Sequence, residues 1–371
     1  MHQGYKILFG GVMWMALAAG FLRPLAPDVH WERLHIFLLN LCAGGTLLLL
    51  FTQGEKRPSK LVLAFGLLSF GYAPLASLEY YTPALLLSLL LAGISEKIRW
   101  QRFGPWGKKV LDSKAPMAER FHAAALLFLS LSLLLLAFVL FNHAWLHLPL
   151  WEKLELNLLF LAFSFPLSLW SFSLFFSFAS KLPQAFSHLS FAGIILGVCL
   201  LFLFILYESP FLELLMALWL TLLVLMLSGA RLWVNPKEPW KNFLTSGMGL
   251  LILSALTGVA YILKLMNPEL PLPSLEAIRQ WHRSIALYGW NLVGLVILLR
   301  FAHFPSWLNS TLSITLHWTL VLGPNLKTPF DAFKSPLHHT PLDTRLGTYP
   351  FKLHPAPSST PLFASFCLLA L

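Results

Sequence analysis

Residues 121–141 read FHAAALLFLSLSLLLLAFVLF and contain no Asp, Glu, Lys or Arg over their whole length. A helix needs about 20 consecutive apolar residues, with a range of about 17–25, to cross the hydrocarbon core of a bilayer. Backbone amides in lipid must be hydrogen-bonded within the protein. For a run this long and this apolar, a helix is the structure that meets this requirement. The stretch therefore predicts a transmembrane helix.

Further stretches along the chain share this character. The stretch 80–95 is short, so its span is the least well supported, and 307–323 is marginal because it contains Asn309 and His317. Besides 121–141, the predicted spans are 7–22, 34–51, 61–78, 80–95, 156–180, 186–207, 211–230, 245–263 and 284–302. We therefore expect an all-α fold, a polytopic transmembrane helix bundle of about 10–12 spans over residues 1–323.

The composition supports this fold class. The chain is 57% hydrophobic and 11% charged, whereas soluble domains have about 45–50% apolar and about 25% charged residues. A bilayer covers apolar surface that a soluble globule of this size would leave in water. The three cysteines form no CxxC motif, which argues against a disulfide framework or a zinc site; they are Cys42, Cys199 and Cys367. The partner that this composition predicts is the lipid bilayer.

The net charge is +10, and the positions of the basic residues along the chain indicate membrane topology rather than nucleic-acid binding. With ten spans, one face holds the N-terminus and the loops after the even-numbered spans, and these segments contain 16 Lys and Arg against six on the opposite face. The loop 96–120 alone contributes seven. Because cytoplasmic loops are enriched in Lys and Arg, the sequence predicts a cytoplasmic N-terminus. The first stretch also has features of a cleaved signal peptide, namely Lys6 followed by an apolar run and small residues, and that alternative leaves the later spans unchanged.

The composition changes near the C-terminus. Eight prolines occur from Pro324 to Pro361, together with several Ser and Thr. Proline removes a helix donor, and such a segment has little apolar surface to bury. We expect 324–371 to be a Pro-rich, poorly ordered tail.

Soluble-enzyme motifs are missing, since the chain contains no GxxxxGK[ST], GxSxG, HExxH or CxxCH. The sequence leaves open whether the protein is an enzyme. Polar residues within spans are costly and become the functional candidates. These candidates are His35, Asn40, His122, Glu213, His282, Tyr288 and Asn291. Glu213 also fits an interfacial carboxylate in the first turn after Ser209-Pro210.

His35 and His282 form the most specific pair. They lie at the outer ends of the second and tenth predicted spans, at similar depth on the same side. Facing imidazoles across a helix bundle are what an axial haem site requires. The alternative is that each is an interfacial histidine bonded to water or backbone.

A histidine near the outer end of the second span, and His282 leading into Leu287-Tyr288-Gly289-Trp290-Asn291 in the tenth, resemble subunit I of haem–copper oxidases and their relatives. The resemblance implies that His35 and His282 are cofactor-binding residues, the axial metal ligands of a low-spin haem. The chain also departs from the pattern of that family, in which histidines of the sixth and seventh spans hold copper. Here the sixth span has no histidine and the seventh has only His188. The copper centre is therefore missing, and oxygen reduction is not expected.

Three functions follow for this membrane protein. The first is a haem-binding, degenerate oxidase-like subunit of a respiratory assembly, with other membrane subunits or a redox partner beside it. The second is a solute transporter in which Glu213, Asn40 and Asn291 line a path, and Gly44-Gly45 and Pro166 supply helix breaks. The third is a structural membrane subunit with no site or cofactor of its own, because Gly, Ser and Pro in spans also serve close helix packing.

Overall fold

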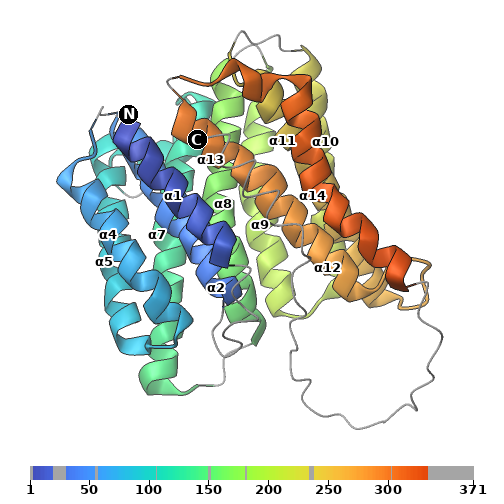
Figure 1. Cartoon of the computed structure of the whole chain (residues 1–371), viewed down its shortest axis with the longest axis horizontal. Helices are drawn as coiled ribbons and strands as arrows, with labels where there is room; N and C mark the ends of the chain where they lie inside the picture. Colours follow the sequence, from blue (N-terminus) through green and yellow to red (C-terminus); the bar gives the residue numbers. More distant parts are fainter. Residues whose placement is uncertain are drawn as a thin grey trace.

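The computed structural model describes residues 3–19, 31–54, 57–105, 107–148, 152–179, 182–233, 238–301 and 303–332. These residues form helices and turns, and no strand occurs among them. The prediction of an all-α bundle is confirmed. Figure 1 shows long helices packed side by side, with α4, α5 and α7 on one flank and α10, α11 and α14 on the other.

The described helices differ widely in length. In chain order the longer ones are α1 (Gln3–Ala19), α4 (Lys60–Ser77), α5 (Tyr81–Phe103), α7 (Met117–Phe141), α8 (Glu152–Phe178), α9 (Gln184–Leu206), α10 (Pro210–Trp233), α11 (Lys241–Met266) and α14 (Thr311–Ala332). The short ones are α6 (Lys108–Leu111), the π-helix η2 (Asn142–Leu146) and the 3-10 helix η4 (Ser306–Asn309).

Two further helices are composite. The first runs through α2 (Trp31–Ile36), the π-helix η1 (Phe37–Gly45) and α3 (Thr46–Gln53). The second runs through α12 (Leu275–Ser284), the π-helix η3 (Ile285–Asn291) and α13 (Leu292–Arg300). Both occupy the middle of the bundle and are among its most buried helices, because they pack against α8 and each other rather than facing lipid.

Eight helices in the described part of the chain are long and apolar enough to cross a membrane. Three shorter apolar helices, Gly4–Ala19, Phe163–Phe178 and Thr311–Gly323, fall on the predicted stretches 7–22, 156–180 and 307–323. The stretch 80–95, expected to be the least secure span, belongs to the continuous 23-residue helix α5. The chain therefore has the helices of a multi-pass membrane protein, whose outer apolar surface would contact lipid.

The core is aromatic and apolar, and α8 lies at its centre. Trp170 of α8 and Trp290 of η3 are the largest fully buried side chains. Helix α14 continues past the expected boundary at residue 323 and ends at Ala332. Residues 333–371, most of the Pro-rich segment, lie outside the described residues, so the tail stays a prediction.

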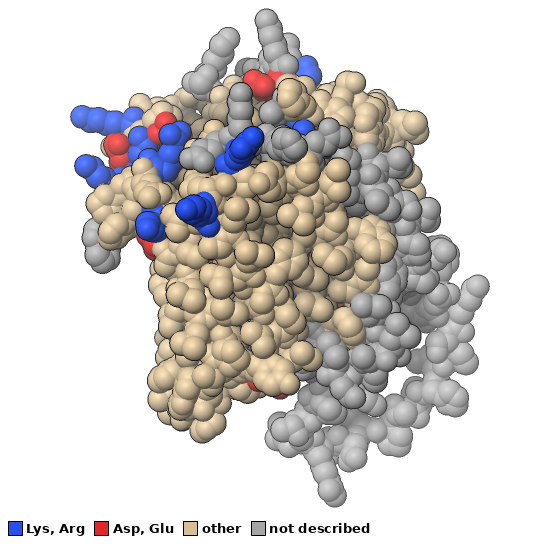
Figure 2. All heavy atoms as spheres, turned by 60° about the vertical axis from the view of Figure 1, so that its left-hand side comes forward, with Lys and Arg blue, Asp and Glu red and all other residues tan. Residues whose placement is uncertain are grey.

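The charged side chains are unevenly distributed. Figure 2 shows Lys and Arg gathered at one end of the molecule on the face in view, while the middle of that face is uncharged. Lys60 begins α4, and Lys97, Arg99 and Arg102 lie near the end of α5, so this basic end includes the start of one helix and the end of the next. An uncharged belt below a basic end is the surface that a bilayer and its positively charged flank require.

Candidate functional site

Both central composite helices contain a π-helical segment, and the predicted site residues cluster around these segments. In a π-helix the backbone bonds run from residue i to i+5, which inserts extra residues into a turn and redirects side chains. Such segments are frequent at functional sites. His35 lies two residues before the start of η1, Asn40 lies within η1, and Tyr288 and Asn291 lie within η3.

His35 is buried, and its two ring nitrogens have different partners. Nδ1 hydrogen-bonds the backbone carbonyl oxygen of Ala16 on α1, and Nε2 lies 2.9 Å from the hydroxyl oxygen of Tyr288. Because a carbonyl can only accept, Nδ1 carries the ring proton, and Nε2 accepts the hydrogen bond that the Tyr288 hydroxyl donates. The ring centroids of His35 and Tyr288 are 5.6 Å apart.

His282 has the same tautomer in a different contact. Its Nδ1 lies 2.9 Å from the carbonyl oxygen of Ser254 on α11 and 3.3 Å from the Thr257 hydroxyl. The neighbouring Gly258 gives the ring room, since a Cβ atom there would stand 3.4 Å from Cε1 of His282. The proton again lies on Nδ1, which leaves the lone pair on Nε2.

The structure brings the second and tenth predicted spans together, but it places Tyr288 rather than His282 on the ring of His35. Among the described residues, the two imidazoles make no contact with each other: His35 bonds Ala16 and Tyr288, and His282 bonds α11. Facing imidazoles, the arrangement expected for axial haem ligands, would require the Tyr288 side chain to leave its position.

The donor chemistry of this pair nevertheless fits a haem. A metal-bound histidine almost always donates its other ring N–H to a carbonyl, a carboxylate or water, which fixes the tautomer and orients the ring. His35 and His282 each donate Nδ1–H to a backbone carbonyl, so Nε2 is unprotonated in both rings, and in His35 it accepts the hydrogen bond of the Tyr288 hydroxyl. No group of three or more His, Cys, Asp or Glu side chains suited to holding a metal ion occurs in the described ranges.

A second polar cluster lies between η1, η3 and α8. The Asn40 side-chain amide donates to Oγ of Ser164 at 3.1 Å, and the Trp290 indole N–H donates to Oγ of Ser168 at 2.9 Å. The Ser168 hydroxyl lies 3.1 Å from the Ser164 carbonyl oxygen and 3.4 Å from Oδ1 of Asn291. One hydroxyl proton cannot serve both acceptors fully, so this cluster is short of hydrogen bonds.

Two amide atoms of the cluster are left over. Asn40 Oδ1 and Asn291 Nδ2 are buried and have no hydrogen-bond partner among the residues that the structure describes. Buried polar atoms of this kind are rare and signal a bound water, an ion or a functional group. Asn40 and Asn291 thus approach the same face of α8, one turn apart through Ser164 and Ser168.

Sequence reasoning missed three members of this region. Ser164 and Ser168 stand on either side of Pro166, and a serine in a span attracts little attention because it can bond its own helix. His317 on α14 is fully buried, and its Nε2 lies 2.8 Å from the carbonyl oxygen of Tyr288. In the sequence, His317 only made the predicted span 307–323 marginal.

The other predicted polar residues lie elsewhere. His122 of α7 is buried beside Thr52, with Nε2 2.8 Å from the hydroxyl oxygen, and is surrounded by the rings of Phe51, Phe103 and Trp170. Glu213 lies in the first turn of α10, which packs on α9 and α11 rather than on the two π-helices. Neither residue belongs to the polar centre.

Comparison with protein-family models, with curated proteins and with solved structures found no match to this chain. The candidate site is therefore defined by its geometry alone. It consists of a buried histidine–tyrosine contact, a second histidine with the same tautomer, and the amide–serine cluster between η1, η3 and α8.

Proposed function

We propose that this protein is a haem-binding membrane subunit that takes part in electron transfer, in which His35 and His282 would hold the haem. The observation that carries the proposal is the shared tautomer: each histidine donates Nδ1–H to a backbone carbonyl and keeps its Nε2 lone pair. A low-spin haem held by two histidines accepts and releases one electron without binding oxygen.

The chain's own residues would orient the ligands. The Ala16 carbonyl on α1 accepts from the His35 ring, and the Ser254 carbonyl on α11 accepts from the His282 ring. Tyr288 would exchange its hydrogen bond to His35 for another partner in the loaded protein. The apolar surroundings, with Phe37 and Trp290 fully buried, keep water away from the ligands.

The test is a visible absorption spectrum of the purified protein, before and after dithionite, from cells supplied with a haem precursor. A Soret band with sharp bands on reduction is the expected result, and His35→Gln and His282→Gln should each remove the low-spin signature. His122→Gln is the matched control, since it changes a buried histidine outside the site. A featureless spectrum from folded protein, even after haem is added, would overturn the proposal.

The amide–serine cluster favours a second candidate, a transporter with an ion site at membrane depth. Transporters coordinate monovalent cations near the midplane with side-chain oxygens and with carbonyls released where a helix is interrupted. Asn40 Oδ1, the two serine hydroxyls and two π-helical segments supply that chemistry. Sodium uptake into proteoliposomes tests it, and uptake should be lost in Asn40→Leu. Equal uptake in empty and protein-containing vesicles would exclude this candidate.

A further inference from the structure

The basic end of the bundle has exposed cations that come from neighbouring elements. Helix α4 begins there, α5 ends there and α6 follows in the connection to α7, while α4 packs on α5 and α6 on α7. Figure 2 shows these Lys and Arg side chains gathered at one end of the face in view. Within the described ranges, the exposed Lys and Arg side chains all belong to this region, and they are Arg57, Lys60, Lys97, Arg102, Lys108 and Lys114.

The acidic side chains of the same region are engaged with other groups. The Glu96 carboxylate accepts from Nε and Nη2 of the buried Arg99 at 3.0 and 2.7 Å, and Glu119 pairs with Lys109 at 2.7 Å. The Asp112 carboxylate accepts from a backbone N–H two residues further along the chain at 3.0 Å. The six exposed cations, by contrast, form no ion pair with any residue that the structure describes. They therefore leave positive charge available at the surface.

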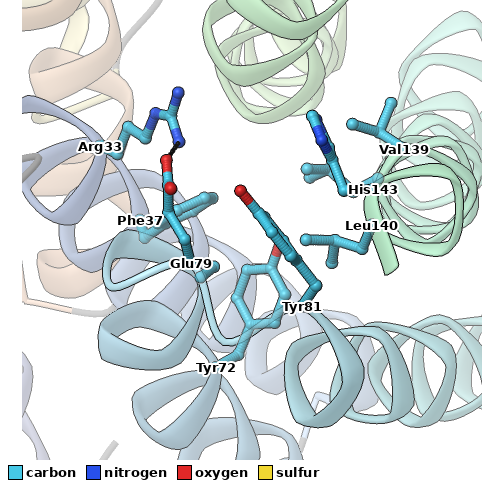
Figure 3. A pocket seen from close by; sticks show the side chains of 10 residues that line it. Arg33, Phe37, Tyr72, Glu79, Tyr81, Val139, Leu140 and His143 are labelled. Carbon is cyan, nitrogen blue, oxygen red and sulfur yellow. Dashed lines mark hydrogen bonds and ion pairs between the residues drawn. The ribbon is translucent and has the colours of Figure 1, made fainter. Parts of the chain in front are cut away.

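Three cations at the opposite end of the bundle have partners within the protein. Nη1 of Arg33 lies 3.4 Å from Oε1 of Glu79, as Figure 3 shows. The Lys264 ammonium, near the connection from α11 to α12, donates to two backbone carbonyls, and Arg279 of α12 pairs with Glu276. Exposed cations without an acidic partner are thus a property of one end of the described bundle.

Helix α6 is held against the bundle and turns one apolar side chain outward. Its Val110 is buried, and the Val110 carbonyl accepts from Nε of Arg120 on α7 at 3.0 Å. The next residue, Leu111, is 79% exposed and lies one turn from Lys108. At a membrane surface, apolar side chains enter the boundary with the acyl chains while Lys and Arg stay with the headgroups. The exposed leucine beside lysines therefore indicates a lipid surface rather than a soluble polyanion.

We propose that this end of the bundle binds anionic phospholipids of the leaflet that it faces. The cations border the uncharged belt, which places them at the depth of the headgroups. Lys60 at the start of α4, and Lys97 and Arg102 near the end of α5, contact the headgroup phosphates. The guanidinium holds two phosphate oxygens at once, whereas each ammonium acts as a point charge. Leu111 enters the acyl boundary beside them.

Lipid retention by the full chain tests the proposal. The protein is exchanged into micelles with equal amounts of phosphatidylglycerol and phosphatidylcholine of the same acyl chains, and native mass spectrometry counts each bound lipid. Each Lys or Arg near an anionic surface changes affinity by about fivefold, so the wild type should retain phosphatidylglycerol over phosphatidylcholine by at least that factor. The triple variant Lys97→Gln, Arg102→Gln, Lys108→Gln should lose most of this preference.

The matched control removes a cation of the same region that already has a partner. Lys109→Gln combined with Glu119→Gln deletes one ion pair and leaves the net charge unchanged, so it should keep the preference of the wild type. The side chains replaced in the triple variant are exposed, and such substitutions usually leave the fold intact. Each variant must first elute as a single folded species, and the single substitutions replace the triple variant if it does not.

Three results would overturn the proposal. The first is equal retention of the two lipids by the folded wild-type protein. The second is an unchanged preference in the folded variants that lack the exposed cations. The third is displacement of phosphatidylglycerol by inorganic phosphate beyond that caused by sodium chloride of equal ionic strength, which would identify a soluble phosphate as the ligand.

Discussion

The hydroxyl oxygen of Tyr288 lies 2.9 Å from Nε2 of His35, although the two residues are 253 positions apart in the sequence. This contact joins the two composite helices where each changes to π-helical geometry. His317 adds a third helix to the same point through the Tyr288 carbonyl. Hydrogen bonds made by His35, Tyr288 and His317 thus connect helices at the centre of the bundle, and such polar residues are rare in spans.

Tyr288→Phe tests how much this contact contributes. The change removes one hydroxyl while keeping the ring, so we expect a loss of about 1 kcal/mol of stability, measured by denaturant unfolding in mixed micelles. His35→Ala should cost more, about 2–4 kcal/mol, because it also removes a buried ring.

Tyr288→Phe also separates two roles of the tyrosine. If His35 binds haem through Nε2, Tyr288→Phe should retain the low-spin spectrum, because the nitrogen loses a competing partner rather than its tautomer. Complete loss of the spectrum in folded Tyr288→Phe, with His35 unchanged, would contradict the assignment of Nε2 as the iron ligand.

A double-mutant cycle between Asn40 and Ser164 tests the amide–serine cluster. The side-chain hydrogen bond of 3.1 Å should give a coupling free energy of about 0.5–1.5 kcal/mol between Asn40→Ala and Ser164→Ala. Asn40 and Ser254, which lies on α11 against His282, form the control pair and should be additive within about 0.5 kcal/mol. Coupling in both pairs would mean that the helices respond globally rather than through this bond.

The helices and their approximate bounds could be predicted because apolar runs of membrane length have one stable backbone structure. The π-helical segments could not. Residues 37–45, FLLNLCAGG, and 285–291, IALYGWN, contain no proline and no Asp, Glu, Lys or Arg, as is usual for a regular helix in a span. Their geometry arises from packing between helices, which a single sequence does not specify.

The candidate site was predictable only in part, for the same reason. The hydropathy pattern identified His35, Asn40, Tyr288 and Asn291 as polar residues in spans. It did not show which helix faces contact each other. The closest pairing is histidine with tyrosine, and not histidine with histidine. The position of His282 against Ser254 depends on the rotation of the composite helix about its axis, which the π-helical segment η3 changes.

Gly289 tests whether the position of η3 is fixed by close packing. A Cβ atom at Gly289 would stand 2.9 Å from Cβ of Leu250 on α11, and neither atom is the end of a flexible side chain. Gly289→Ala should therefore destabilise the protein by about 1–3 kcal/mol and displace Tyr288 and Trp290 beside it. Gly93→Ala is the control, since nothing lies within 4 Å of a Cβ there, and it should be neutral or stabilise α5 by up to about 1 kcal/mol.

The last prediction concerns orientation in the membrane. The basic end of the bundle in Figure 2 includes the segment between α5 and α7, and enrichment in Lys and Arg marks cytoplasmic loops. We therefore predict that Ser113, which is exposed in that segment, faces the cytoplasm. Tyr80, exposed in the turn between α4 and α5 at the opposite end, should face outward.

Single cysteines at these two positions, in a chain whose Cys42, Cys199 and Cys367 are replaced by Ala, give opposite expectations. Ser113→Cys should resist an impermeant thiol reagent in intact cells and react once the membrane is opened, whereas Tyr80→Cys should react at once. Labelling of Ser113→Cys together with protection of Tyr80→Cys in intact cells would invert the orientation.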